Sequence, residues 1–70
     1  MKLNSGQVLQ AIYDEELNFE IVTFWDGGFT FKLGDCLNGY KETRDFYTFE
    51  EGVHWLRSAI WVHYGKVIKL

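Results

Sequence analysis

The sequence predicts an α+β fold: a three-stranded antiparallel β-meander that is packed on one face by a C-terminal helix and by an N-terminal helix (α-β-β-β-α). Two aromatic-rich runs meet at residues 26–28, Asp-Gly-Gly, and these residue types tolerate the positive φ of a tight hairpin turn. A second turn signal, Asn-Gly at residues 38–39, precedes a charged run, and an amphipathic segment begins at Thr48. Residues 1–70 are therefore predicted to form a single small domain.

Residues 5–16 are predicted to form the N-terminal helix. Apolar residues recur there at helical rather than alternating spacing, at Val8, Leu9, Ile12 and Tyr13. Asn4 or Ser5 can cap the start of the helix, because both side chains accept hydrogen bonds from the first free amides. An edge strand is the alternative for this segment.

Residues 19–35 are predicted to form the first β-hairpin. A two-residue turn at positions 26–27 sets Phe24 opposite Phe29. A turn at positions 27–28 would change the partners but not the faces, because side chains alternate along each strand. The core-facing side then carries Val22, Phe24, Phe29, Phe31 and Leu33. The opposite, open face is too apolar for an ordinary solvated surface, and it carries Phe19, Ile21, Thr23, Trp25, Thr30 and Lys32.

Residues 40–46 are predicted to return as the third antiparallel strand after the turn at residues 38–39. This strand is rich in charge, with Lys41, Glu42, Arg44 and Asp45. Charged side chains are typical of an edge strand, because they oppose pairing with foreign strands.

The C-terminal helix is predicted to begin at Thr48, which forms a capping box with Glu51. One broad stripe of this helix is suited to face the core, and it consists of Phe49, Gly52, Val53, Leu56, Ala59, Ile60, His63 and Tyr64. Gly65 is a typical helix stop. Residues 66–70 are predicted to form a short tail or an added edge strand.

Length, charge and cysteine content exclude several classes of protein. No run approaches the roughly 18–20 apolar residues that cross a bilayer, and the first residues lack the apolar stretch of a signal peptide. The single cysteine, Cys36, cannot form an internal disulfide, which suits a reducing compartment. The formal net charge is −3 and the basic residues are scattered, which argues against nucleic-acid binding. We expect a cytoplasmic protein without contact to membranes.

No residues combine into a recognisable catalytic or metal site. His54 and His63 fall on different faces of the predicted helix, so a shared metal ion is not expected. Cys36 has no neighbouring histidine that could lower the pKa of its thiol. Asp26 and Asp35 each stand beside a glycine, where turn chemistry explains them. The sequence therefore predicts a protein that is not an enzyme and has no cofactor or metal.

The predicted fold leaves more apolar surface than its helices can cover. Contiguous apolar patches on a small domain mark an interface, so we predict a protein partner or self-association, with a dimer as one form. The residues predicted to bind are Phe19, Ile21, Trp25, Lys32, Trp55, Arg57, Trp61 and Val62. The competing interpretation is that 70 residues cannot bury so many aromatic rings. The alternative function is nucleic-acid or small-ligand binding through the sheet aromatics.

The motif at residues 24–29, Phe-Trp-Asp-Gly-Gly-Phe, is followed by Leu-Gly-Asp at 33–35, Asn-Gly at 38–39 and a helix that ends in His63-Tyr64. This pattern resembles a family of short bacterial proteins of unknown function. The resemblance covers most of the chain and implies the fold, but it implies no activity.

A looser similarity is to antitoxins of the HicB type, in which a Gly-rich hairpin and a short strand precede a Thr-x-Glu-Glu helix, comparable to Thr48, Glu50 and Glu51. This similarity implies that the chain binds a protein. The chain departs from the pattern by an N-terminal extension and by the lack of a DNA-binding C-terminal segment. The predicted element order is also similar to that of double-stranded-RNA-binding domains, but the basic residues that such binding needs are missing.

Overall fold

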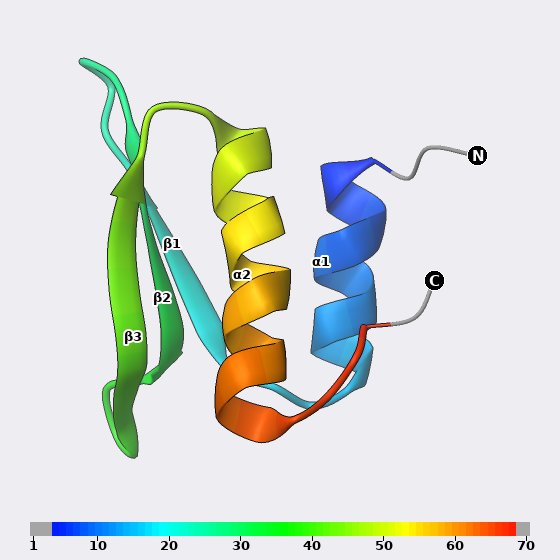
Figure 1. Ribbon diagram of the computed structural model, residues 1–70. Coiled ribbons are helices and arrows are strands. Elements are labelled where there is room, and N and C mark those ends of the chain that lie inside the picture. Colours follow the sequence, from blue (N-terminus) through cyan, green and yellow to red (C-terminus); the bar gives the residue numbers. More distant parts are fainter. Residues whose placement is uncertain (1–3, 69–70) are drawn as a thin grey trace.

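The computed structural model describes residues 4–68 and has the predicted order of elements (Figure 1). The elements are helix α1 (Ser5–Asp14), strand β1 (Phe19–Thr23), strand β2 (Phe29–Asp35), strand β3 (Gly39–Phe46) and helix α2 (Phe49–Tyr64). The three strands form one antiparallel sheet in the order β1-β2-β3. The α+β fold class and the α-β-β-β-α order predicted from the sequence are confirmed.

Both helices lie on the same side of the sheet, and α2 lies between the sheet and α1 (Figure 1). Helix α2 packs against β2 and β3, whereas α1 packs against α2. A helix with neighbours on two sides needs a wider apolar stripe than one that only covers a sheet. This arrangement explains why α2 is more apolar than a single core-facing stripe requires.

The core lies where the three layers meet. Its fully buried side chains come from α1, β2 and α2, and they are Ile12, Phe31, Leu33, Leu56 and Ile60. The tail after α2 adds Ile68, whose side chain is buried and whose carbonyl oxygen accepts a 3.0 Å hydrogen bond from Nη2 of Arg57. The described part of the tail, residues 65–68, forms no strand; residues 69 and 70 lie outside the described residues.

Helix α1 confirms the predicted helix and rules out the edge strand. Asn4 caps it: the Asn4 side chain accepts from the Gln7 amide at 2.8 Å, and the Gln7 side chain accepts from the Asn4 amide at 3.0 Å. Val8 and Ile12, one turn apart, are buried. Tyr13, which we expected on the same stripe, is exposed. A narrow stripe suffices because α1 contacts only α2 among the described elements.

The register of the first hairpin differs from the prediction by one residue. Ile21 lies opposite Phe31, where the prediction placed Val22. The cause is the turn. The Phe24 amide donates a hydrogen bond to the Gly28 carbonyl oxygen (3.2 Å), so the turn between Phe24 and Gly28 contains three residues and not the predicted two. A one-residue shift in register moves every side chain of a strand to the other face. The predicted assignment of β1 side chains to faces is therefore wrong.

Thr48 and Gly65 cap the two ends of α2 as predicted, but the Glu51 carboxylate bonds to the Thr48 hydroxyl and not to the backbone amide that a capping box requires. The Thr48 hydroxyl accepts from the Glu51 amide at 3.2 Å and donates to the Glu51 carboxylate at 2.8 Å. Gly65 ends the helix in the left-handed conformation with φ 66°, which Gly adopts without steric cost. The predicted stripe is buried from Gly52 to Ile60, but His63 and Tyr64 at its end are exposed, and His63 contacts the Glu42 side chain of β3 instead of the core.

Helix α2 approaches the sheet closely where Gly52 faces the ring of Phe31. A Cβ atom at position 52 would overlap that ring. Phe31 is fully buried and also meets the rings of Phe46, at 5.8 Å between centroids, and Phe49, at 5.7 Å. The absence of a side chain at position 52 therefore sets how closely the helix approaches the sheet.

We expect Gly52→Ala to lower the free energy of unfolding by about 1–2 kcal/mol in total. Overpacking by the added methyl group costs about 2–3 kcal/mol, because its Cβ would overlap the Phe31 ring, and the better helix propensity of Ala offsets roughly 1 kcal/mol of this loss. Urea denaturation measures the difference, with Ser58→Ala on the exposed side of α2 as the matched control. A Gly52→Ala variant as stable as the wild type would contradict the close contact.

Candidate functional site

The sheet face that points away from the helices is polar. The Tyr40 hydroxyl donates a hydrogen bond to the Glu20 carboxylate, and Nζ of Lys32 lies 5.1 Å from the centroid of the Tyr40 ring. Next to them, Oγ1 of Thr30 donates to Oδ1 of Asp45 at 2.6 Å. These contacts satisfy the polar groups of the face within the chain. The predicted apolar open face is therefore wrong.

Two of the residues predicted to bind a partner on that face lie on its other side. Phe19 and Ile21 are half-buried and pack against the core, because the shifted register turns them toward the helices. Trp55 of α2 is also half-buried and lies against Phe46, with 5.7 Å between ring centroids. Lys32 is on the open face, where it contacts Tyr40 rather than an aromatic patch.

The remaining predicted residues are divided between two ends of the molecule. Arg57, Trp61 and Val62 line a hollow between α2 and the tail, and the Trp61 side chain is 58% exposed. Trp25 lies in the loop between β1 and β2, which projects from the opposite end of the domain (Figure 1). The structure thus does not bring the predicted residues together into one surface.

The strongest concentration of exposed aromatic side chains is at the hairpin loop. Trp25 is 98% exposed, Phe24 is 49% exposed, and Tyr47, in the connection from β3 to α2, is 92% exposed. We call these three residues the aromatic end. Two segments distant in sequence therefore place three aromatic rings at one end of the sheet.

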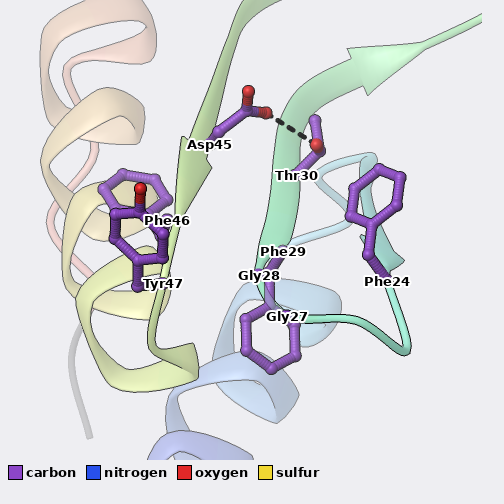
Figure 2. Close-up of a pocket in the computed structure, with 8 residues that line it drawn as sticks. All are labelled: Phe24, Gly27, Gly28, Phe29, Thr30, Asp45, Phe46 and Tyr47. Atoms are coloured by element: carbon purple, nitrogen blue, oxygen red, sulfur yellow. Dashed lines mark hydrogen bonds between the residues drawn. The ribbon is translucent and has the colours of Figure 1, made fainter.

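A hollow of about 420 Å³ lies at the aromatic end. Figure 2 shows Phe24 and Tyr47 on opposite sides of it, with Gly28 between them. The paired side chains of Thr30 and Asp45 lie at one end of the hollow. Its lining residues are Phe24, Gly27, Gly28, Phe29, Thr30, Asp45, Phe46 and Tyr47. The hollow thus combines aromatic walls, a glycine floor and one carboxylate.

Local structure explains why these rings are exposed. Gly27 and Gly28 both have positive φ, 121° and 98°, and they let the chain turn sharply after Trp25. On the other side, Phe46 is half-buried and Tyr47 is exposed, as alternation along an extended chain requires. Sequence reasoning assigned Phe24 to the core and overlooked Tyr47. The adjacent pair of rings at positions 46–47 was the available signal, since only one of them can face inward.

The aromatic end is acidic. The segments 24–31 and 45–53 that build it contain Asp26, Asp45, Glu50 and Glu51, and the basic residues Lys32 and Arg44 directly adjoin them in sequence. The carboxylate of Glu51 is engaged by the Thr48 hydroxyl. The lining of the hollow itself contains Asp45 and no basic side chain. The hollow therefore presents negative but no positive charge.

The acidic turn at the opposite end of β2 is a structural feature. Oδ1 of Asp35 accepts from the amides of Leu37 (2.8 Å) and Asn38 (2.7 Å), and Oδ2 accepts from the Asn18 side chain (2.7 Å). These bonds, the Asn38 amide first, hold the pKa of Asp35 below its usual value. Cys36 in this turn is exposed. Turn chemistry accounts for Asp35, as predicted.

The two histidines lie apart, as their spacing predicts. Nε2 of His63 contacts the Glu42 carboxylate at 2.9 Å, and this hydrogen bond lowers the pKa of Glu42. His54 is exposed. Among residues 4–68, no three His, Cys, Asp or Glu side chains gather closely enough to hold a metal ion.

The chain matches no family model, no curated protein and no solved structure. The resemblances to short bacterial proteins and to HicB-type antitoxins therefore stay predictions. Within residues 4–68, neither helix is both long enough and apolar enough to cross a membrane. The fold and the aromatic end together define the class: a small α+β domain with an exposed aromatic and acidic surface.

The polar open face gives a titration that can be tested. The hydrogen bond to the Glu20 carboxylate raises the pKa of Tyr40 to about 12 from the ordinary 10.0. Because the neutral hydroxyl is the donor, the bond stabilises the fold below pH 10.0 and this contribution is lost as the pH rises toward 12. NMR titration of the Tyr40 Cζ resonance should show a pKa of about 12.

In a Glu20→Gln variant the pKa of Tyr40 should return toward 10.0. Wild-type protein in which Tyr40 already titrates near 10.0 would show that the bond to Glu20 is absent in solution.

Proposed function

We propose that this chain is a non-enzymatic protein-interaction module and that the aromatic end is its contact surface. The observation that carries the proposal is the exposure of three neighbouring aromatic side chains, with Trp25 at 98% and Tyr47 at 92%. Such side chains contribute almost nothing to folding while they remain in water. Their position at a projecting loop suits contact with another macromolecule.

The energy that these rings can supply is large for a domain of this size. Burying a Trp or Tyr side chain against a partner contributes on the order of 2–3 kcal/mol. Trp and Tyr are also the residues most enriched among those that dominate binding energy at protein interfaces. Two or three such anchors account for a specific complex when the surrounding contacts exclude water.

The partner contact must extend beyond the three rings. A typical interface covers about 800 Å² on each partner, which is roughly a sixth of the 5134 Å² of this protein's surface. The residues around the hollow and the first turn of α2 are placed to supply the additional area (Figure 1). The partner is a second protein or another copy of this chain, as for an inhibitor, an antitoxin-like binder or a homodimer.

The positions of the histidines and of Cys36 support an interaction role over an enzymatic one. His63 contacts Glu42, His54 is exposed elsewhere on α2, and Cys36 lies in an exposed turn at the other end of β2. The acidic character of the aromatic end opposes binding of nucleic acid, whose phosphates repel carboxylates. A single free cysteine fits the reducing cytoplasm.

The proposal is tested by replacing Trp25 with a photo-cross-linking amino acid in the native host, and by placing the same residue at Trp61 as a matched control. We expect a discrete cross-linked product from position 25, either with one protein or with a second copy. Excess wild-type protein should suppress this product, because it competes for the same partner.

A Trp25→Ser/Tyr47→Ser variant should fail to compete, whereas Trp61→Ser/Val62→Ser should compete as well as the wild type. Both pairs remove exposed apolar side chains, so neither is expected to unfold the domain. A product from position 61 alone, or equal competition by both variants, would exclude the aromatic end as the contact surface.

A further inference from the structure

We infer that the hollow at the aromatic end binds the guanidinium group of an arginine that the partner protein displays. This inference rests on the proposed function and names the chemistry of the partner at the contact. It draws on three observations: the geometry of the aromatic walls, the position of the Asp45 carboxylate, and the distribution of charge around the hollow.

The walls of the hollow leave room for one flat group. Phe24 follows β1 and Tyr47 follows β3, and β2 lies between these strands. Two interstrand spacings separate the backbones of β1 and β3, about 10 Å in total. Aromatic atoms pack at about 3.5–4 Å from a neighbouring plane, so a planar group in this space can stack on one of the two rings. Gly28 supplies no side chain to block this space (Figure 2).

The Asp45 carboxylate lies where a cation between the rings could reach it. Thr30 donates to Oδ1 of Asp45 at 2.6 Å and thereby fixes the orientation of the carboxylate. Among residues 4–68, no hydrogen-bond donor engages Oδ2. A guanidinium group presents parallel N–H donors in a plane, which suits both pairing with a carboxylate and stacking on rings.

The surrounding charge favours a cation over a neutral or anionic group. The side chains that line the hollow include the carboxylate of Asp45 and no basic group. The faces of aromatic rings also attract cations. Arginine is favoured over lysine because its planar group is more weakly hydrated and loses less on leaving water. The partner surface is therefore expected to be basic, with an arginine at its centre.

The test is an NMR titration of the folded wild-type protein with N-acetyl-arginine amide and with N-acetyl-citrulline amide, which has the same shape without the charge. Free amino-acid derivatives should bind weakly, with a Kd on the order of 10 mM. We expect arginine to bind at least about threefold more tightly than citrulline. The affected amides should be those of Gly27, Gly28 and Tyr47.

Two variants that each remove one negative charge locate the interaction. Asp45→Asn retains an oxygen that can accept from Thr30, and it should weaken arginine binding about two- to fivefold without changing citrulline binding. Glu15→Gln removes a charge near the C-terminal end of α1, remote from the hairpin loop (Figure 1), and should leave arginine binding unchanged. Equal binding of arginine and citrulline, no binding, or an equal effect of both variants would overturn the inference.

The failure of this inference and that of the proposed function are distinguishable. If the cross-link from position 25 depends on Trp25 and Tyr47 but arginine shows no preference over citrulline, the interaction surface stands and the arginine site is rejected. If arginine binds selectively but the cross-link is insensitive to Trp25→Ser/Tyr47→Ser, the arginine site stands and the aromatic end is rejected as the contact surface.

Discussion

The arrangement of the whole domain depends on the contact between the ring of Phe31 and the bare backbone of Gly52. This contact lets α2 settle on the middle of the sheet, where Phe31 also meets Phe46 and Phe49. Once α2 is in place, its other side is free to receive α1. A domain of 70 residues has little apolar area to spare, so one close helix–sheet approach accounts for much of its packing.

The elements could be predicted from the sequence because each has a local signal. Asn4 and Thr48 accept from free amides at the starts of the helices, Gly65 ends α2, and the glycines after Asp26 mark the hairpin. The faces of β1 could not be predicted in the same way. Whether the turn contains two or three residues depends on the backbone conformation at residues 25–27. The one additional residue decides whether Ile21 or Val22 faces the core.

The third residue of the hairpin turn also explains why the sequence did not predict the aromatic end. With Phe19 and Ile21 turned inward, the open face keeps only polar contacts such as that of Tyr40 with Glu20. The surplus aromatic surface is concentrated at one end instead, around Trp25. Exposure of Trp25 could be anticipated. Its neighbours Phe24 and Tyr47 become a group only through folding, because they directly follow β1 and β3, two strands that do not pair with each other.

The register of β1 on β2 is the claim on which both the polar open face and the aromatic end depend, and interstrand NOEs measure it directly. The account predicts contacts that place Ile21 opposite Phe31 and Val22 opposite Thr30. Contacts that place Val22 opposite Phe31 would return Phe19 and Ile21 to the open face. That result would contradict the account, because the apolar surface would then lie along the sheet.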